Sequence, residues 1–179
     1  MMMKRIILGI SIFLLLASCV VENFATQSPV ATVRNPGIKF QEEFLSRINR
    51  LREKGCNCGN TYMPPAPPLV WNTQLELAAL AHAQDMNRNK YFDHKSKDGR
   101  TIKDRITGAG YTPTGYRAFI IGENIAWGQR SIKEVMDGWI GSPAHCRNLM
   151  KPDFKEVGIA FYNSYWVQDF GGRYPFARR

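Results

Sequence analysis

The stretch GSPAHCRNLM, residues 141–150, places His145 directly before Cys146. These two side chains could act as a nucleophile with its base, as a pair of metal ligands, or as a histidine beside a structural disulfide. Neighbouring residues on a helix point about 100° apart, so a Cys146–His145 catalytic pair has unfavourable geometry. We therefore expect the two residues to have separate roles.

The cysteines favour a disulfide if the chain is exported. Cys56 and Cys58 are too close in sequence to bridge easily to each other. A bridge from either of them to Cys146 would close a loop of about 90 residues and stabilise the fold by roughly 4–5 kcal/mol. The sequence leaves the choice between Cys56 and Cys58 open, and one thiol would remain unpaired. A three-cysteine metal site is an alternative, although the usual CxxC spacing is missing.

The N-terminus predicts export. Lys4 and Arg5 precede an apolar run over residues 6–16, which is too short to span a hydrocarbon core of about 30 Å but fits a signal peptide. The letters LASC then resemble a bacterial lipobox, in which Cys19 would be lipidated after cleavage. An ordinary cleavage site and a chance cysteine are the alternatives. Because Val20 follows instead of the aspartate that usually retains lipoproteins at the inner membrane, an outer-membrane destination is favoured.

Composition and charge limit the classes of molecule that we expect as partners. The net charge of +9 falls to +7 when Lys4 and Arg5 leave with the signal, and the remaining basic residues are scattered. Without a basic and aromatic stripe, and in an exported protein, nucleic acid is not an expected partner. We expect a signal peptide over 1–18, a lipidated cysteine with a flexible tether over 19–37, one folded domain over 38–172, and a C-terminal tail over 173–179.

Two longer helices are predicted in the first half of the domain. Apolar residues recur at helical spacing over 38–54, and Gly55 is a plausible stop. A second helix is expected from Thr73, whose spacing to Glu76 is that of a capping box. His82 lies in register with the apolar residues of that helix, so we expect a buried, hydrogen-bonded structural histidine.

The remaining elements predict helices around a small, mostly antiparallel sheet. The proline-rich connection is expected to be irregular. Ser142 is expected to cap a helix through its hydroxyl, with Pro143 in the first turn. In chain order we expect an irregular connection over 56–71, a short helix over 101–110, a strand over 119–128, a helix over 132–141 capped by Ser131 with Glu134, a helix from Ser142, and a hairpin over 156–172 that turns at Asn163–Ser164.

Six segments in unbroken order make the chain similar to the bacterial branch of the CAP superfamily, the SCP-like domain shared with cysteine-rich secretory proteins and pathogenesis-related proteins. They are LSRINRLREKG, LVWNTQLELAALAHAQDM, YFDHKSKDGRTIKDRITGAGY, GENIAWG, GWIGSPAHCRNLMKPDFKEVGIAF and YWVQDFG. The resemblance implies an α+β fold, an α-β-α sandwich with a small antiparallel central sheet and a surface cleft.

The resemblance also implies a cleft of two histidines and two acidic residues, which hold zinc or another divalent cation in some members. The first histidine matches His94, the glutamate matches Glu123, and the second histidine matches His145. The second acidic position falls on Ser142, so one carboxylate is absent. Two imidazoles and one carboxylate would suit zinc, iron or manganese. A hydrogen-bonded His–Glu–His cluster without a physiological metal is the alternative.

Three function classes follow, and no catalytic residue is assigned. The favoured one is a membrane-anchored binding module that uses the cleft for a lipid, a sterol-like ligand or a cell-wall fragment. The second is a divalent-metal-dependent hydrolase acting on cell-envelope or peptide substrates. The third is a structural or host-interaction protein with a vestigial cleft. Ser142 counts against the hydrolase, because a lost carboxylate removes both attraction for a cation and a possible general base.

Overall fold

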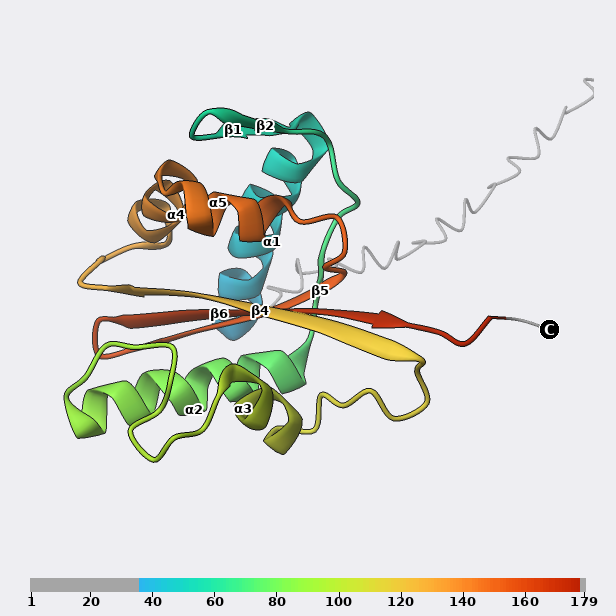
Figure 1. The fold of residues 1–179 in the computed structure, drawn as a ribbon. Helices are drawn as coiled ribbons and strands as arrows, with labels where there is room; N and C mark the ends of the chain where they lie inside the picture. The colour runs from blue at the N-terminus through green and yellow to red at the C-terminus, as the bar shows by residue number, and fades with distance from the viewer. Residues whose placement is uncertain (1–35, 178–179) are drawn as a thin grey trace, which may run out of the picture. The chain divides into compact units, whose positions relative to one another are not determined.

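The computed structural model describes residues 36–177, so the predicted signal peptide, Cys19 and most of the predicted tether lie outside the described residues. Within this range, helices cover both faces of a sheet (Figure 1). One face carries α1 (Pro36–Lys54), α4 (Ile132–Gly141) and α5 (Pro143–Met150). The other face carries α2 (Thr73–Asn89) and α3 (Ile102–Gly108). This three-layer arrangement confirms the predicted α-β-α sandwich.

The central sheet has the strand order β3-β5-β6-β4. The strands are β3 (Val70–Trp71), β4 (Ala118–Trp127), β5 (Glu156–Tyr162) and β6 (Tyr165–Tyr174). All pairings are antiparallel except that of the two-residue β3, which runs parallel to β5. Because β4 is an edge strand, segments from both helical layers are able to approach each other around it.

The turn between β5 and β6 confirms the predicted hairpin. Asn163 and Ser164 have φ angles of 45° and 73°, the left-handed pair that a two-residue turn requires. The pairing Tyr162 with Tyr165 sets the register of the whole hairpin. The folded elements extend two residues past the predicted limits at each end, to Pro36 and Tyr174.

The connection over 56–71 is not irregular throughout, so that prediction was wrong. It contains an antiparallel hairpin, β1 (Cys56–Cys58) with β2 (Thr61–Met63), and also β3. The prolines occupy only 64–68. The eight residues before them all have a backbone N–H group and can therefore donate hydrogen bonds in a hairpin. Gly59 makes the turn with a φ of +65°.

Two helix starts differ in detail from the predicted caps. Asn72, not Thr73, is the N-cap of α2, and its side-chain oxygen accepts from the N–H groups of Gln74 and Leu75. In α4, Ser131 accepts from the Glu134 N–H as predicted, but the Glu134 carboxylate reaches Arg130 N rather than closing a box. Asn is as good a cap as Ser or Thr, so the one-residue shift costs the helix nothing.

The core has one part on each face of the sheet. Beneath α1 and α4, aromatic side chains fill the layer, with Phe44, Trp139 and Phe170 fully buried. Beneath α2, alanines allow the helix to lie close to the sheet. At Gly158 of β5, an added Cβ would stand 2.0 Å from the backbone nitrogen of Glu76, so this approach depends on glycine.

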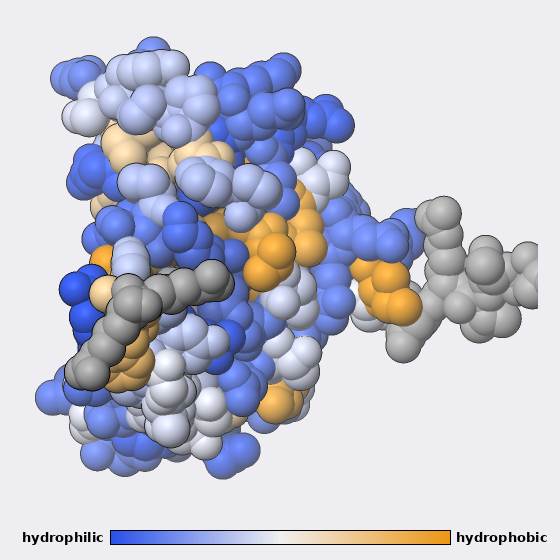
Figure 2. Space-filling model, turned by 90° about the vertical axis from the view of Figure 1, so that its right-hand side faces the viewer, coloured by the Kyte–Doolittle hydropathy of each residue, from blue (hydrophilic) through white to orange (hydrophobic). Residues whose placement is uncertain are grey.

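The side of the molecule seen in Figure 2 is largely hydrophilic. Figure 2 shows one flank of the molecule, on which blue residues dominate and apolar residues gather near mid-height. Among the described residues, every helix is too short or too polar to cross a membrane.

Candidate functional site: a buried glutamate and two histidines at the edge of the sheet

Glu123 is the centre of the predicted cleft. It lies on the edge strand β4, and its side chain is fully buried. Oε1 is 2.6 Å from Nδ1 of His94, and Oε2 accepts a hydrogen bond of 2.7 Å from Nη2 of Arg105. Both carboxylate oxygens are therefore engaged by positively charged or protonatable groups.

Arg105 is a site residue that the sequence reasoning missed. The capping box of Thr101 and Asp104 starts α3 and fixes the direction of the helix. Arg105 is buried, and its guanidinium also contacts Ser96 Oγ at 3.3 Å. Its position three residues after Ile102 and one before Ile106 was the available signal, since that spacing places it on the buried face.

Asp169 of β6 is a second residue that was missed. It pairs directly with Glu123 in the β4–β6 register, so both side chains lie on the same face of the sheet. Asp169 is fully buried, and burial together with the nearby negative charge of Glu123 raises its pKa well above the usual range. Both effects favour the neutral, protonated form of this carboxyl group. Two adjacent polar letters, QD, inside the apolar run YWVQDFGG were the signal.

An amide network on the opposite face positions α5, which carries His145. Nδ2 of Asn124 donates to the backbone oxygen of His145 at 3.2 Å and to Oε1 of Gln168 at 3.0 Å. Nδ2 of Asn148 donates to the backbone oxygen of Glu123 and to Oδ1 of Asn124. Strand β4 is thus bonded to the helix of His145 on one face and to the His94 side chain on the other.

The two cleft histidines have opposite electrostatic environments. The hydrogen bond with Glu123 raises the pKa of His94, even though burial acts against it. Burial and the charge of His94 lower the pKa of His145. His94 is therefore the better cation, and His145 the better neutral donor or acceptor for a ligand.

A hollow of about 380 Å³ opens beside His145. Phe92 and Trp127 are 51% and 60% exposed, and Ser142 contributes a hydroxyl. Ser142 starts α5 by its backbone but makes no side-chain cap hydrogen bond, so the prediction that its hydroxyl is occupied was wrong. The complete lining is Phe92, Ile125, Ala126, Trp127, Gln129, Val135, Gly138, Trp139, Ser142 and His145.

The predicted trio does not fit a three-ligand metal site. Among residues 36–177, Cys56, Cys58 and Cys146 form the only group of three whose ligand atoms all lie within 4.8 Å of one another. Glu123 is bound through Oε2 to the cation of Arg105, and His94 directs Nδ1 at the same carboxylate. The arrangement is a hydrogen-bonded cluster in which Glu123 orients His94.

His82 lies under this cluster as the predicted structural histidine. It is fully buried, and Nε2 is 3.0 Å from the backbone oxygen of Asp93. Burial lowers the pKa of His82, which favours its neutral form. The contact holds the loop that carries His94.

The cysteines separate from the site. Cys58 is bonded to Cys146 with a Cα–Cα distance of 5.4 Å, and Cys56 has a free thiol. The predicted bridge is therefore confirmed, with Cys58 as the partner. Cys146 is engaged in the bridge, so it is no nucleophile for His145.

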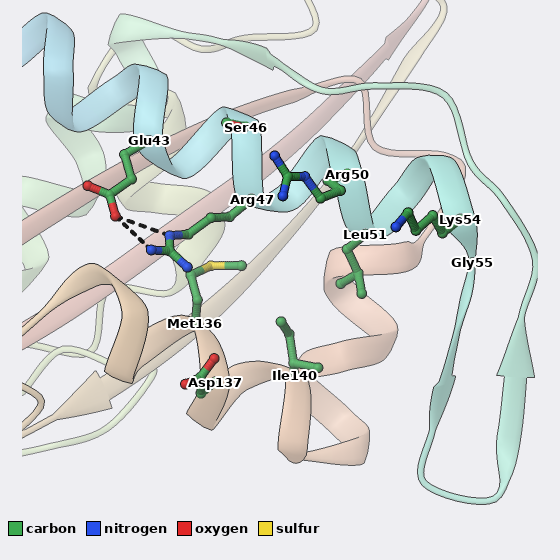
Figure 3. A pocket seen from close by; sticks show the side chains of 10 residues that line it. All are labelled: Glu43, Ser46, Arg47, Arg50, Leu51, Lys54, Gly55, Met136, Asp137 and Ile140. Atoms are coloured by element: carbon green, nitrogen blue, oxygen red, sulfur yellow. Dashed lines mark hydrogen bonds and ion pairs between the residues drawn. The ribbon is translucent and has the colours of Figure 1, made fainter.

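A second hollow, of about 520 Å³, lies between α1 and α4 (Figure 3). Its floor is apolar, with Leu51, Met136 and Ile140 directed into it. Its α1 rim carries Arg50 and Lys54, next to the ion pair of Arg47 with Glu43. It shares no lining residue with the hollow at His145.

Comparisons with known proteins agree with this architecture. The sequence model of the Cysteine-rich secretory protein family (CAP) matches residues 45–170. The Bacillus subtilis proteins YkwD and YlbC, the latter described as a membrane protein, are 34% and 31% identical over 108 and 103 residues. These matches cover 59% and 57% of this chain but only 40% and 28% of the relatives, so the chain corresponds to less than half of each.

Solved structures show the same fold. An extracellular Bacillus anthracis protein containing an SCP domain superposes with a TM-score of 0.57 at 26% identity, over 76% of this chain and 43% of the other. An outer surface protein of Borrelia burgdorferi gives a TM-score of 0.61 at 22% identity, over 75% of this chain and 93% of the other. The family model spans most of the domain, and the sheet and the helical layers agree with that fold: the chain belongs to the CAP, or cysteine-rich secretory protein, family.

Proposed function

We propose that this chain is an exported, lipid-anchored binding protein whose cleft holds a small, partly apolar molecule such as a lipid, a sterol-like compound or a cell-wall fragment. The composition of the hollow at His145 carries the proposal. Exposed Phe92 and Trp127 stand beside His145 and the unbonded hydroxyl of Ser142. Apolar walls with a few polar groups are typical of small-molecule sites, and about 380 Å³ is within their usual size.

Binding is better supported than metal-dependent hydrolysis. A hydrolytic zinc site needs three protein ligands and an open position, and here Glu123 is already committed to His94 and Arg105. Ser142 supplies no second carboxylate. Exposed aromatic residues would also suit an interaction with another protein, so it is the hollow between them that favours a small molecule.

The test is saturable binding of a fluorescent fatty acid and of a fluorescent sterol to the full chain. The Trp127→Ala variant lacks the indole and should bind the fatty acid or the sterol about tenfold or more weakly, because an aromatic contact of this size contributes at least 1–2 kcal/mol. His145→Ala should weaken it as well. Leu77→Ala is the matched control, since Leu77 is equally exposed but lies on α2.

Binding of the ligand in the second hollow, between α1 and α4, would contradict the proposal. If binding survives Trp127→Ala and His145→Ala but is lost in Ile140→Glu, the ligand lies between α1 and α4 and the cleft proposal is wrong. The absence of saturable binding by both probes would favour the structural role.

Export and anchoring rest on the N-terminal sequence and on the location of similar proteins. The apolar run over 6–16 and Cys19 support a lipoprotein signal, and the matched structures include an extracellular protein and an outer surface protein. Lipidation at Cys19, with Val20 after it, would direct the chain to the outer membrane where a cell has one. Cells fed an alkyne-labelled palmitate should label the wild-type chain and not Cys19→Ser; equal labelling of both would refute the anchor.

A further inference from the structure

The free thiol of Cys56 lies beside the Cys58–Cys146 bridge. Its Sγ is 3.6 Å from Sγ of Cys146 and 3.9 Å from Sγ of Cys58. Cys56 and Cys58 are two residues apart on β1, and alternate residues of a strand point to the same side. The hairpin therefore presents two sulfurs to the single cysteine of α5.

The three sulfurs differ in their access to solvent. Cys58 and Cys146 are 1% and 0% exposed and pack with Met150. Cys56 is half-buried, so within this trio it is the sulfur that an outside reagent reaches first. Both Cys56 and Cys58 thus have a sulfur close to that of Cys146, but only the sulfur of Cys56 is accessible to solvent.

We propose that Cys56, Cys58 and Cys146 form a thiol–disulfide exchange site. The Cys56 thiol loses its proton, and the thiolate attacks Sγ of Cys146. The Cys58–Cys146 bond breaks as the Cys56–Cys146 bond forms, and Cys58 leaves as a thiolate that takes up a proton. One disulfide and one thiol are present before and after the step, so no oxidant or reductant is consumed.

The geometry explains why the exchange is slow in the folded chain. The two sulfur–sulfur distances are nearly equal, which places the Cys56 sulfur beside the S–S bond, whereas displacement requires attack along that bond. The half-buried Cys56 side chain must therefore rotate first. Burial also raises the pKa of the Cys56 thiol, which keeps the reactive thiolate scarce.

Exchange would change which thiol the molecule displays. In the resting form the free thiol is on Cys56, within reach of solvent; after exchange it is on the buried Cys58. The chain would thereby hide or present a reactive thiol without changing its oxidation state. This inference is independent of the cleft and of its ligand.

The direct test is the bridge formed by Cys58→Ser in the full chain folded under oxidising conditions. Peptide mapping without reduction should find Cys56 bonded to Cys146, with a melting temperature within about 5 °C of the wild type. Cys56→Ser should keep the Cys58–Cys146 bridge. The double variant Cys56→Ser/Cys58→Ser should lack a bridge to Cys146 and melt at a lower temperature. Two free thiols at Cys56 and Cys146 in a folded Cys58→Ser protein would overturn the proposal.

A measurement on the wild type covers the case in which Cys58→Ser fails to fold. The protein is held at mildly alkaline pH, trapped with acid at intervals, unfolded, and labelled with a maleimide at low pH. Because Cys56 and Cys58 share one peptide, fragment ions must locate the label: it should begin on Cys56 and become shared with Cys58, while Cys56→Ser should show no label on Cys58. Label confined to Cys56 at every interval would refute the exchange.

Discussion

At the scale of single residues, Glu123 joins His94 and Arg105 through its two oxygens, whereas the hollow beside it is lined by His145 and not by Glu123 or His94. Burial alone would raise the pKa of Glu123, but the hydrogen bond with His94 and the charge of Arg105 outweigh it and lower that pKa. Burial and this negative charge raise the pKa of the neighbouring Asp169. Two carboxyl groups whose pKa values are shifted in opposite directions thus stand side by side on the sheet, and Arg105 supplies a cation beside Glu123.

The two cleft histidines should titrate on opposite sides of their usual pKa of 6.5, and histidine NMR signals followed against pH would show it. The pKa of His94 is expected above this value and that of His145 below it. Glu123→Gln should lower the pKa of His94, because the accepting anion is gone. A pKa of His94 at or below that of His145 in the wild type would contradict the arrangement.

The same shifts give the sign of the pH dependence of stability. His94 has a raised pKa in the folded state, so its contribution is complete below pH 6.5 and is lost as the pH rises through that raised value. His145 has a lowered pKa, so its contribution is complete above pH 6.5 and is lost as the pH falls through the lowered value. His145→Gln should remove only the second of these slopes from the unfolding free energy. His94→Gln should remove the first slope and also reduce the second, because the charge of His94 contributes to the lowered pKa of His145.

At the scale of elements, Arg52 joins α1 to three other segments. Its buried guanidinium donates to the backbone oxygens of Pro67, Leu149, Lys151 and Phe154. Burial lowers the pKa of Arg52 to about 10, and it remains charged at neutral pH. The four carbonyl groups replace water around this cation, and each depends on it in turn.

Arg52→Met should therefore lower the free energy of unfolding by about 3–5 kcal/mol, since it leaves several buried carbonyl groups without donors. Arg50→Met on the same helix is the control, and it should change stability by about 0.5 kcal/mol or less because Arg50 is exposed. Urea denaturation measures both. Equal stability of the two variants would show that the hydrogen bonds of Arg52 to these backbone oxygens contribute little to stability.

The contact between α2 and the sheet gives a second prediction. Gly158→Ala would place a Cβ against the backbone of α2, so we expect a loss of about 3 kcal/mol or more by denaturant unfolding. Gly138→Ala in α4 meets nothing within 4 Å and should be neutral or stabilise by about 0.5–1 kcal/mol. Should Gly158→Ala be as stable as Gly138→Ala, the close packing of α2 would be wrong.

Periodicity and turn chemistry predicted the helices and the longer strands, but they missed β1, β2 and β3 and did not predict the contacts between elements. The apolar spacing of α1 and the Asn163–Ser164 turn are local features, so the sequence predicts them correctly. The positions of Glu123, His94 and His145 came from a family resemblance, because no short spacing brings them together. Arg105 and Asp169 were missed because partners from separate elements decide whether a buried charge is satisfied.

At the scale of the whole molecule, the bridge links the β1–β2 hairpin to α5 across 88 residues of chain. In the chain-entropy account, such a loop contributes roughly 4–5 kcal/mol. Reduction should therefore lower the free energy of unfolding by an amount of this order, measured by denaturation with and without a reductant. A change below about 1 kcal/mol would mean that the layers alone hold α5 in place.

We propose that the hollow at His145, and not another surface, receives the ligand. A fatty acid or sterol carrying a photoreactive diazirine, crosslinked to the full chain and mapped by mass spectrometry, tests it most directly. We predict adducts on the peptides of Phe92, Trp127 and Ser142–His145 that unlabelled ligand suppresses. Adducts confined to the α1–α4 hollow, around Leu51 and Ile140, would contradict the account.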